Sequence, residues 1–385
     1  MVITFICDVL GKPNNGTSIA VFNQMNAMAE KGHEVRCICP DEEYRGRKNF
    51  YICKAINFYI FNHYVAKNGV HPAAGDTKVL REALKGADIA TMNFCGALSK
   101  KAVKICKEMG IPYVGSFNAQ AENFTNHVFM MNFRPANWFI YRHLNVKMFS
   151  RLQAIHYPTK FIRDLFQEET GNNVKAYVVS NGVRKDFVHK KVAKPEIYKD
   201  KIIIVFSARY SKEKDPMTLL KAVNKSKYFD SIQLILPGVG PMWKKLEKFT
   251  SKWKNKPVFG FHSREELIDI LNYADLYVHP SIIDLEAISA LEAMATGLVP
   301  VLSDSPRAAI KTFALSEHNL FKMKDPVDLA SKIDYWIEHP EEKEEYRKKY
   351  VEFAKKFDFD DAMDKMERMF LETIEEYKKN KDERK

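Results

Sequence analysis

The chain has 385 residues, of which 46% are hydrophobic and 28% charged, a composition typical of a globular protein with room for two domains. No apolar run approaches the ~18 residues of a membrane span, and the six cysteines form no CxxC pair, which argues against an integral membrane protein and a disulfide scaffold. The first residues lack a basic region before an apolar run, so no signal peptide is expected. We therefore expect a cytoplasmic protein with reduced thiols.

The net charge of +11 is unevenly distributed. Residues 44–68 contain five Lys or Arg residues and no acid, and residues 123–163 contain six and no acid. Aromatic residues are interspersed with the basic ones in both windows. Such clustering indicates an anionic partner surface rather than a generally basic protein.

Residues 1–182 alternate between strand-like and helix-like segments, which predicts a first α/β domain with a parallel sheet. A polar loop after the first strand ends at Gly16 and Thr17, and no GxGxxG dinucleotide motif is present. The strand predicted at 112–116 is followed closely by Asn118. Strands are predicted at 2–7, 34–39, 87–92, 112–116, 154–158 and 177–180, and helices at 18–31 and 98–108.

A further helix is predicted at 136–152, where the apolar residues form one stripe with Arg142 and Lys147 beside it. An amphipathic helix packed on its own sheet and a helix lying on a membrane have the same pattern, so both interpretations stay open. The stripe consists of Trp138, Tyr141, Leu144, Met148 and Leu152.

Residues 183–200 are polar and charged and are predicted to form a linker to a second α/β domain at 201–359. The strand at 201–207 is followed by Arg209 and Lys214, which can reach one diphosphate across a strand-to-helix turn. Strands are also predicted at 233–237, which precedes Gly238 and Gly240, and at 258–261, which ends at Phe261. The last predicted helix is long and charged and covers 360–378.

Residues 275–305 read as strand, helix and strand, and we consider this βαβ unit the centre of the chain. Two acids, Asp284 and Glu286, lie near the start of the helix predicted at 287–296, and Glu292 lies within it. The ligand crevice of an open α/β sheet lies at the carboxyl ends of its strands, so these acids are candidate site residues.

The unit resembles the retaining glycosyltransferases of family 4, whose signature is an acid, seven residues, and then Glu in a Leu-Glu-Ala-Met-Ala run. Here Asp284 takes the first position, where the family usually has Glu, and Glu292 takes the second. The resemblance implies the GT-B fold, in which two Rossmann-like domains face a cleft and the C-terminal helix crosses back to the first domain. It is strong over 201–305 and weaker before residue 180.

The resemblance also implies roles for individual residues. Arg209 and Lys214 would stabilise the leaving diphosphate, Glu292 would hold the ribose hydroxyls, and Asp284 would hold the donor sugar. Asn118 stands where the family commonly has a His that contacts that sugar. No DxD metal motif lies where such chemistry would need one, so no metal or other cofactor is expected. The remaining donor-binding residues implied are Gly16, Thr17, Gly238, Gly240, Phe261, Glu286, Ala287 and Ile288.

We therefore expect a retaining transferase that moves a hexose, such as glucose, from a UDP-sugar to a membrane lipid such as diacylglycerol, similar to membrane-lipid α-glucosyltransferases. The basic windows favour attachment to the inner face of the cell membrane, with Trp138, Tyr141, Arg142 and Lys147 at the acceptor side. Polysaccharide or glycan-precursor synthesis is an alternative. A second alternative is a nucleotide-sugar-binding protein without turnover. Nucleic-acid binding is not expected, because no RNA-binding motif is present.

Overall fold

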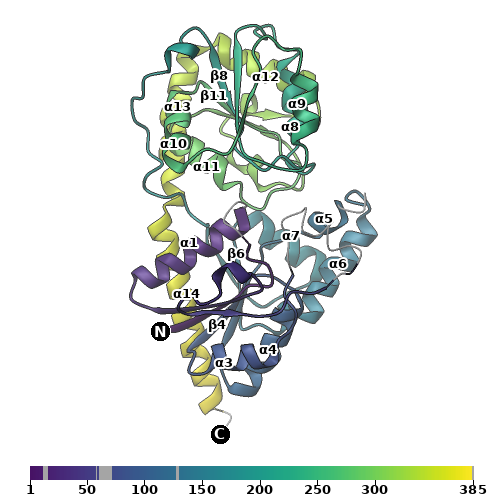
Figure 1. Cartoon of the computed structure of the whole chain (residues 1–385), viewed down its shortest axis with the longest axis vertical. Helices are drawn as coiled ribbons and strands as arrows, with labels where there is room; N and C mark the ends of the chain where they lie inside the picture. Colours follow the sequence, from purple (N-terminus) through teal and green to yellow (C-terminus); the bar gives the residue numbers. More distant parts are fainter. Residues whose placement is uncertain (12–15, 58, 60–71, 127–129, 384–385) are drawn as a thin grey trace. The chain divides into compact units, whose positions relative to one another are not determined.

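The computed structural model describes residues 1–11, 16–57, 59, 72–126 and 130–383. Its contacts divide the chain into two compact units, Met1–Asn181 with Asp361–Lys385, and Gly182–Asp360. Each unit is a parallel β-sheet with helices on both faces (Figure 1). The predicted α/β class and the parallel sheets are therefore confirmed.

The first unit contains a seven-stranded sheet in the order β3-β2-β1-β4-β5-β6-β7. Every neighbouring pair is parallel, and β1 at the centre pairs with both β2 and β4. Strand β3 lies within the basic window at 44–68, for which the sequence pattern indicates no strand, and part of that window lies outside the described residues. The strands are β1 (Val2–Ile6), β2 (Glu34–Cys39), β3 (Phe50–Ile52), β4 (Ile89–Met92), β5 (Tyr113–Ser116), β6 (Ala154–Tyr157) and β7 (Lys175–Val178).

Helix α14 (Phe359–Asp382) ends the described chain but packs in the first unit. Its apolar face, which includes Met369 and Phe370, is fully buried. Its acidic face carries Glu367, which lies 3.0 Å from the Lys31 ammonium and 2.7 Å from His33 Nε2. The first unit is thus completed by the last segment of the chain. Its other helices are α1 (Gly16–Glu30), α3 (Thr77–Leu84), α4 (Ala97–Met109), α5 (Ala121–Thr125), α6 (Arg134–Lys147) and α7 (Lys160–Thr170).

The second unit contains a six-stranded parallel sheet in the order β10-β9-β8-β11-β12-β13. Counted within the unit, this is the strand order 3-2-1-4-5-6 of a dinucleotide-binding Rossmann fold. The central strand β8 has the sequence Ile-Ile-Ile-Val, and a run of β-branched residues is typical of a strand buried on both faces. The strands are β8 (Ile202–Val205), β9 (Ile232–Pro237), β10 (Val258–Gly260), β11 (Leu276–His279), β12 (Pro300–Ser303) and β13 (Leu320–Phe321).

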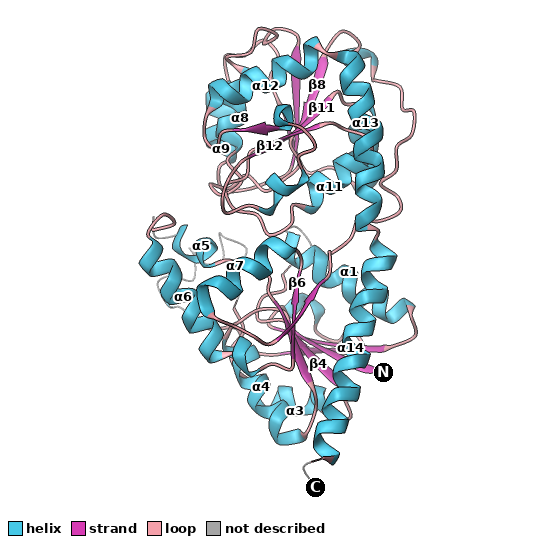
Figure 2. Ribbon diagram, turned by 180° about the vertical axis from the view of Figure 1, so that it is seen from behind, coloured by secondary structure: helices cyan, strands magenta, loops and turns pink. Residues whose placement is uncertain are grey.

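The helices of the second unit form two layers around this sheet. In Figures 1 and 2, α8, α9 and α12 lie on one side of the strands and α11 and α13 on the other. None of the described helices in either unit is both long and apolar enough to cross a membrane. The helices are α8 (Pro216–Val223), α9 (Trp243–Thr250), α10 (Arg264–Tyr273), α11 (Ile288–Ala295), α12 (Pro326–Glu338) and α13 (Pro340–Ala354).

Residues 183–200, which the sequence suggests are a linker, lie within the second unit and are attached to it. Val183 and Phe187 are buried in its hydrophobic core. His189 Nδ1 lies 2.9 Å from the carbonyl oxygen of Thr296, and the Lys194 ammonium donates to Asp275 at 2.9 Å. The segment looks like a linker in sequence because its polar residues outnumber the few apolar residues that anchor it.

Candidate functional site

The sheet of the second unit has a topological switch point between β8 and β11, which are neighbours in space but not in sequence. Ligands of open α/β sheets bind beyond the carboxyl ends of the strands at such a point. Arg209 and Lys214 follow β8, and Asp284 follows β11. The structure therefore places these three predicted site residues at one edge of one sheet.

The carboxylate of Asp284 joins the two loops at this edge. Its Oδ2 accepts hydrogen bonds from the Lys214 ammonium at 2.5 Å and from His279 Nε2 at 2.9 Å, and its Oδ1 accepts one from the backbone N–H of Ala287 at 2.9 Å. Burial acts to raise the pKa of Asp284, but the charge of Lys214 and the hydrogen bond from His279 hold it well below its usual range. Asp284 is therefore an ionised, buried carboxylate with partners on both oxygens.

His279 is a member of this site that sequence reasoning missed. It is the last residue of β11 and is fully buried. Burial lowers its pKa against the opposing effect of Asp284, so the imidazole is neutral at neutral pH. With Nε2 donating to Asp284, Nδ1 accepts from the Tyr277 hydroxyl at 3.1 Å. A single His in a strand is usually core packing, and only the proximity of Asp284 distinguishes this one.

The loop before α11 brings backbone amides toward the same edge. Ala287 adopts a left-handed conformation, with φ 59° and ψ 57°, and Ile288 begins the helix. An alanine disfavours this conformation, and the hydrogen bond of its N–H to Asp284 helps to hold it there. Glu286 is buried just before it. The predicted region Glu286 to Ile288 is thus an ordered turn whose backbone is fixed by Asp284.

The loop after β9 packs against the segment that carries Arg209. A Cβ atom on Gly238 would lie 2.1 Å from the carbonyl oxygen of Ala208, and one on Gly240 would lie 2.5 Å from that of Tyr210. Larger residues would therefore push the loop away from the chain before and after Arg209. Both glycines hold two loops of the site together, whether or not they also touch a ligand.

Phe261 follows β10 and is 77% exposed. The strand before it is well anchored, because Phe259 packs on Trp243 and Tyr210 with ring centroids 5.8 and 5.9 Å apart. The Phe261 ring is thus an exposed aromatic surface on an ordered edge of the sheet, as a residue that stacks on a base would be.

Glu292 lies one turn inside α11 and is half-buried. Burial raises the pKa of its carboxyl to about 8, with Arg264 acting to lower it and Asp186 to raise it. The carboxyl has no hydrogen bond or ion pair with the described residues. With this pKa, Glu292 is mostly protonated at neutral pH, and its carboxyl can both donate a hydrogen bond to a ligand and accept one from it.

In the first unit, the predicted residue Asn118 lies after β5 and donates from Nδ2 to the carbonyl oxygen of Asn93 at 3.1 Å. Asp8 was not predicted and lies buried after β1. It accepts from the N–H groups of Leu98 and Ser99, at 2.8 and 3.1 Å, at the start of α4. Burial raises the pKa of Asp8, although these amides oppose the effect. Its carboxylate therefore caps α4.

Gly16 is exposed and is the first residue of α1. Thr17 lies in the first turn of the same helix, and its side chain lies outside the described residues. The loop that precedes them, at 12–15, lies outside them too, so their predicted part in donor binding stays a prediction.

For four of the five residues of the apolar stripe, the structure supports core packing rather than membrane contact. The helix predicted at 136–152 ends at Lys147, so Met148 and Leu152 follow α6 instead of lying on it. Tyr141 is 1% exposed, and its hydroxyl donates to Glu122 at 2.7 Å. Its ring packs on Phe117, which also contacts Phe149, Tyr157 and Phe166. This aromatic cluster attaches α6 to its own sheet, so the stripe is core packing. The other buried members are Leu144, Met148 and Leu152.

A different face of the same region is exposed, and we call it the α6 surface. Trp138 is 49% exposed, and the Arg142 guanidinium lies 5.4 Å from its ring centroid. Phe139 is 64% exposed. The α6 surface comprises the exposed residues Met130, Phe133, Arg134, Trp138, Phe139, Arg142, Val146 and Lys147.

Comparison with known protein families assigns both halves of the chain. Residues 14–187 match the Glycosyltransferase Family 4 model, and residues 188–357 match the model of glycosyl transferases group 1. No curated protein matches the chain. The family models therefore agree with the resemblance inferred from the signature around Asp284 and Glu292.

Solved structures also resemble the chain. HepE from Anabaena, in complex with UDP and glucose, is 14% identical over 97% of this chain and 100% of that chain, with a TM-score of 0.72. Sucrose-phosphate synthase from Thermosynechococcus elongatus is 14% identical over 97% and 98%, with a TM-score of 0.74. The catalytic domain of cholesterol-α-glucosyltransferase from Helicobacter pylori is 41% identical over 40% of this chain and 98% of that chain, with a TM-score of 0.39. The two full-length matches confirm the predicted GT-B fold.

Replacing Glu292 with Gln should change how stability depends on pH. The carboxyl has a pKa of about 8 in the folded chain, against 4.5 for an unperturbed glutamate, so the folded state holds its proton more tightly. Its contribution to stability is complete below the lower value and is lost as the pH rises toward the higher one. Glutamine has no such proton to lose. The difference in unfolding temperature between Glu292→Gln and wild type should therefore shift in favour of the variant by roughly 2–5 °C as the pH rises from 5 to 9.

Thermal unfolding by circular dichroism across this pH range measures the difference. Glu247→Gln, at an exposed position of α9 in the same unit, controls for the loss of one negative charge. A difference between Glu292→Gln and wild type that is constant from pH 5 to pH 9 would contradict the assignment.

Proposed function

We propose that this chain transfers a hexose from a nucleotide diphosphate sugar with retention of anomeric configuration. Both halves of the chain match glycosyltransferase family models. The observation that carries the proposal is the Lys214 cation at the switch point of the second sheet, oriented by Asp284 and following Arg209. UDP is the nucleotide we favour, because a structure of the same fold contains UDP and glucose. Glucose is the sugar we favour on the same ground.

The two cations fit the chemistry of a leaving diphosphate. An ammonium group has three N–H donors, and Asp284 uses one of those on Lys214, so the others are available to phosphate oxygens. Charge develops on the leaving phosphate in the transition state, and donors fixed beforehand stabilise it most effectively there. Asp284 has partners on both oxygens, so we assign it a positioning role for Lys214 and the Ala287 amide rather than direct contact with the sugar.

The reaction is a substitution at the anomeric carbon of the donor sugar. The bond from this carbon to the diphosphate oxygen breaks, and the acceptor oxygen bonds to the same face. The acceptor proton passes to the leaving phosphate, which departs with the electron pair of the broken bond. Arg209 and Lys214 stabilise the charge on the phosphate, and Glu292 binds the ribose hydroxyls, for which its carboxyl, unpaired among the described residues, is suited.

For the acceptor we propose a membrane lipid alcohol such as diacylglycerol, used at the inner face of the cell membrane. The α6 surface supports this choice, because it combines exposed aromatic residues with three cations, and such a surface suits an anionic leaflet. A polysaccharide or glycan precursor is the alternative acceptor, and a nucleotide-sugar-binding protein without turnover is the alternative function.

Loss of either proposed phosphate-binding cation should abolish most of the activity. Arg209→Ala and Lys214→Ala should each lower kcat/KM by at least ~10²-fold, because each removes a donor to the developing charge. Transfer from labelled UDP-sugars to a total lipid extract, followed by separation of the products, measures the effect. Lys221→Ala, an exposed lysine on α8, serves as the control. Normal turnover in either folded variant would refute these roles, and absence of transfer by the wild type with every sugar would favour a binding protein.

Transfer should not require a metal ion, since Arg209 and Lys214 supply the positive charge that the diphosphate needs. Activity with the preferred sugar should persist in excess EDTA, as measured by the same product assay. Complete loss that Mg²⁺ or Mn²⁺ restores would show that the two cations are insufficient.

The α6 surface should bind anionic membranes. Arg142→Glu with Lys147→Glu should reduce co-sedimentation with anionic vesicles, and glycosylation of lipid in them, by at least about tenfold, because each residue near the leaflet contributes ~1 kcal/mol. UDP-sugar binding should be unchanged. High salt should release the wild type, since the Debye length falls from ~10 Å at 0.1 M to ~3 Å at 1 M. Lys104→Glu with Lys107→Glu, exposed on α4, makes the same charge change elsewhere. If both double variants lost the same share of vesicle binding, a soluble glycan acceptor would be favoured.

A further inference from the structure

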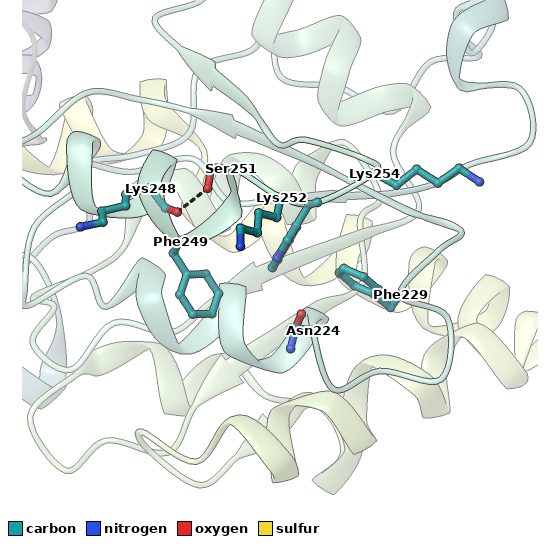
Figure 3. Close-up of a pocket in the computed structure, with 8 residues that line it drawn as sticks. Asn224, Phe229, Lys248, Phe249, Ser251, Lys252 and Lys254 are labelled. Atoms are coloured by element: carbon teal, nitrogen blue, oxygen red, sulfur yellow. Dashed lines mark hydrogen bonds between the residues drawn. The ribbon is translucent and has the colours of Figure 1, made fainter.

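The second unit contains a surface cavity of about 660 Å³ that is unrelated to the candidate site (Figure 3). It is formed by the residues after α8, the end of α9, and the loop that leads to β10. These segments precede β9 and β10, so the cavity lies at the amino ends of the strands, whereas the candidate site lies at the carboxyl ends of the same sheet. The lining residues are Asn224, Phe229, Lys248, Phe249, Ser251, Lys252, Trp253 and Lys254.

Aromatic rings form the apolar part of this cavity. The ring of Trp253 stands edge-on to Phe229, with centroids 5.1 Å apart, and lies 6.0 Å from Phe249. Phe249 is 39% exposed, although it is a large apolar residue at the end of α9. Three aromatic rings around one open cavity suit a ligand or surface that is partly apolar.

The loop that carries the lysines is held in place by hydrogen bonds. Asn255 donates to the carbonyl oxygens of Asp230 and Ile232, at 2.7 and 3.1 Å, and accepts from the Lys201 ammonium at 3.0 Å. The Ser251 hydroxyl donates to the carbonyl oxygen of Lys248 at 2.9 Å, which Figure 3 marks as a dashed line. The cavity is therefore preformed.

The charge around the cavity is strongly positive. Residues 244–256 contain six lysines and one acid, Glu247. Lys248, Lys252 and Lys254 are all exposed, and none makes an ion pair with a residue in the described part of the chain. In Figure 3, Lys248 and Lys254 extend in opposite directions and Lys252 lies between them. Lys227, on the other side of the same region, is paired with Glu338 at 2.9 Å, whereas the three lysines at the cavity are available to an external anion.

We propose that this cavity binds the phosphate-bearing headgroup of an anionic phospholipid in a membrane surface. Lysines around an open cavity can reach headgroup phosphates, while the exposed ring of Phe249, backed by Trp253, enters the boundary between headgroups and acyl chains. A bilayer presents many headgroups at once, so a shallow site on the surface is sufficient. The proposal does not depend on which acceptor the enzyme uses, and it concerns a different unit from the α6 surface.

The test replaces the three cavity lysines together in the full chain. Lys248→Gln, Lys252→Gln and Lys254→Gln are introduced into the Arg142→Glu, Lys147→Glu background, which removes the contribution of the α6 surface. Co-sedimentation is measured with vesicles of phosphatidylcholine alone and of phosphatidylcholine with phosphatidylglycerol. The background protein should bind the anionic vesicles, and the triple substitution should weaken that binding by about 10²-fold, or roughly fivefold per lysine.

The matched control replaces Lys199, Lys348 and Lys355 with Gln, exposed lysines elsewhere in the second unit, and thereby makes the same change in net charge. This control should lose less than about a tenth of the binding that the cavity substitutions remove, and UDP-sugar binding should be the same in the background protein and in both triple variants. Equal losses in the two triple variants would overturn the proposal, as would a background protein that ignores anionic vesicles. Tighter binding of a single-stranded oligonucleotide than of the vesicles, abolished by the same lysine substitutions, would overturn it in favour of a nucleic-acid site.

Discussion

The arrangement of the candidate site depends on one buried carboxylate, that of Asp284. It connects the loop after β8, through Lys214, to the end of β11, through His279, and to the start of α11, through the Ala287 amide. A buried anion is tolerated only when paired and hydrogen-bonded, and this one has partners on both oxygens. Because a shorter acid occupies the position where the family usually has Glu, the carboxylate is held close to the backbone, which suits it for organising the loops.

Much of the fold was predictable, because strands buried in parallel sheets carry continuous β-branched and apolar runs. The strand at 34–39 has the predicted bounds, and the positions on which the signature depends, Arg209, Lys214, Asp284 and Glu292, fall where a Rossmann-like sheet binds ligands. The sequence could not show which hydrogen-bond or ion-pair partner each polar side chain has in the fold. His279 and Asp8 lie on buried strand ends, where a polar residue has no local pattern to mark it, and only the neighbouring loop or helix gives it a function.

The ambiguity of the apolar stripe at α6 has a physical origin. An apolar stripe indicates that one face of a helix is buried, but it does not say whether protein or lipid covers that face. Here the cluster around Phe117 and Phe166 covers it, and Tyr141 contributes its ring to that cluster and its hydroxyl to Glu122. Of the stripe only Trp138 remains exposed, and the other exposed apolar residues, such as Phe139 and Val146, lie outside it. The lysine cluster at 244–256 is likewise not evident from charge summed over long windows, because such sums average a short cluster with its surroundings.

The return of α14 to the first unit has a consequence for how the protein is made. The residues of this helix leave the ribosome after the whole second unit, yet Met369 and Phe370 belong to the interior of the unit that is synthesised before it. During translation, the first unit must therefore wait with an uncovered apolar surface while the whole of the second unit emerges, and domains that emerge intact have no such delay. A nascent chain of this design benefits from a chaperone until residues 361–385 have emerged, and a premature stop codon that removes them leaves the second unit whole but the first unit incomplete.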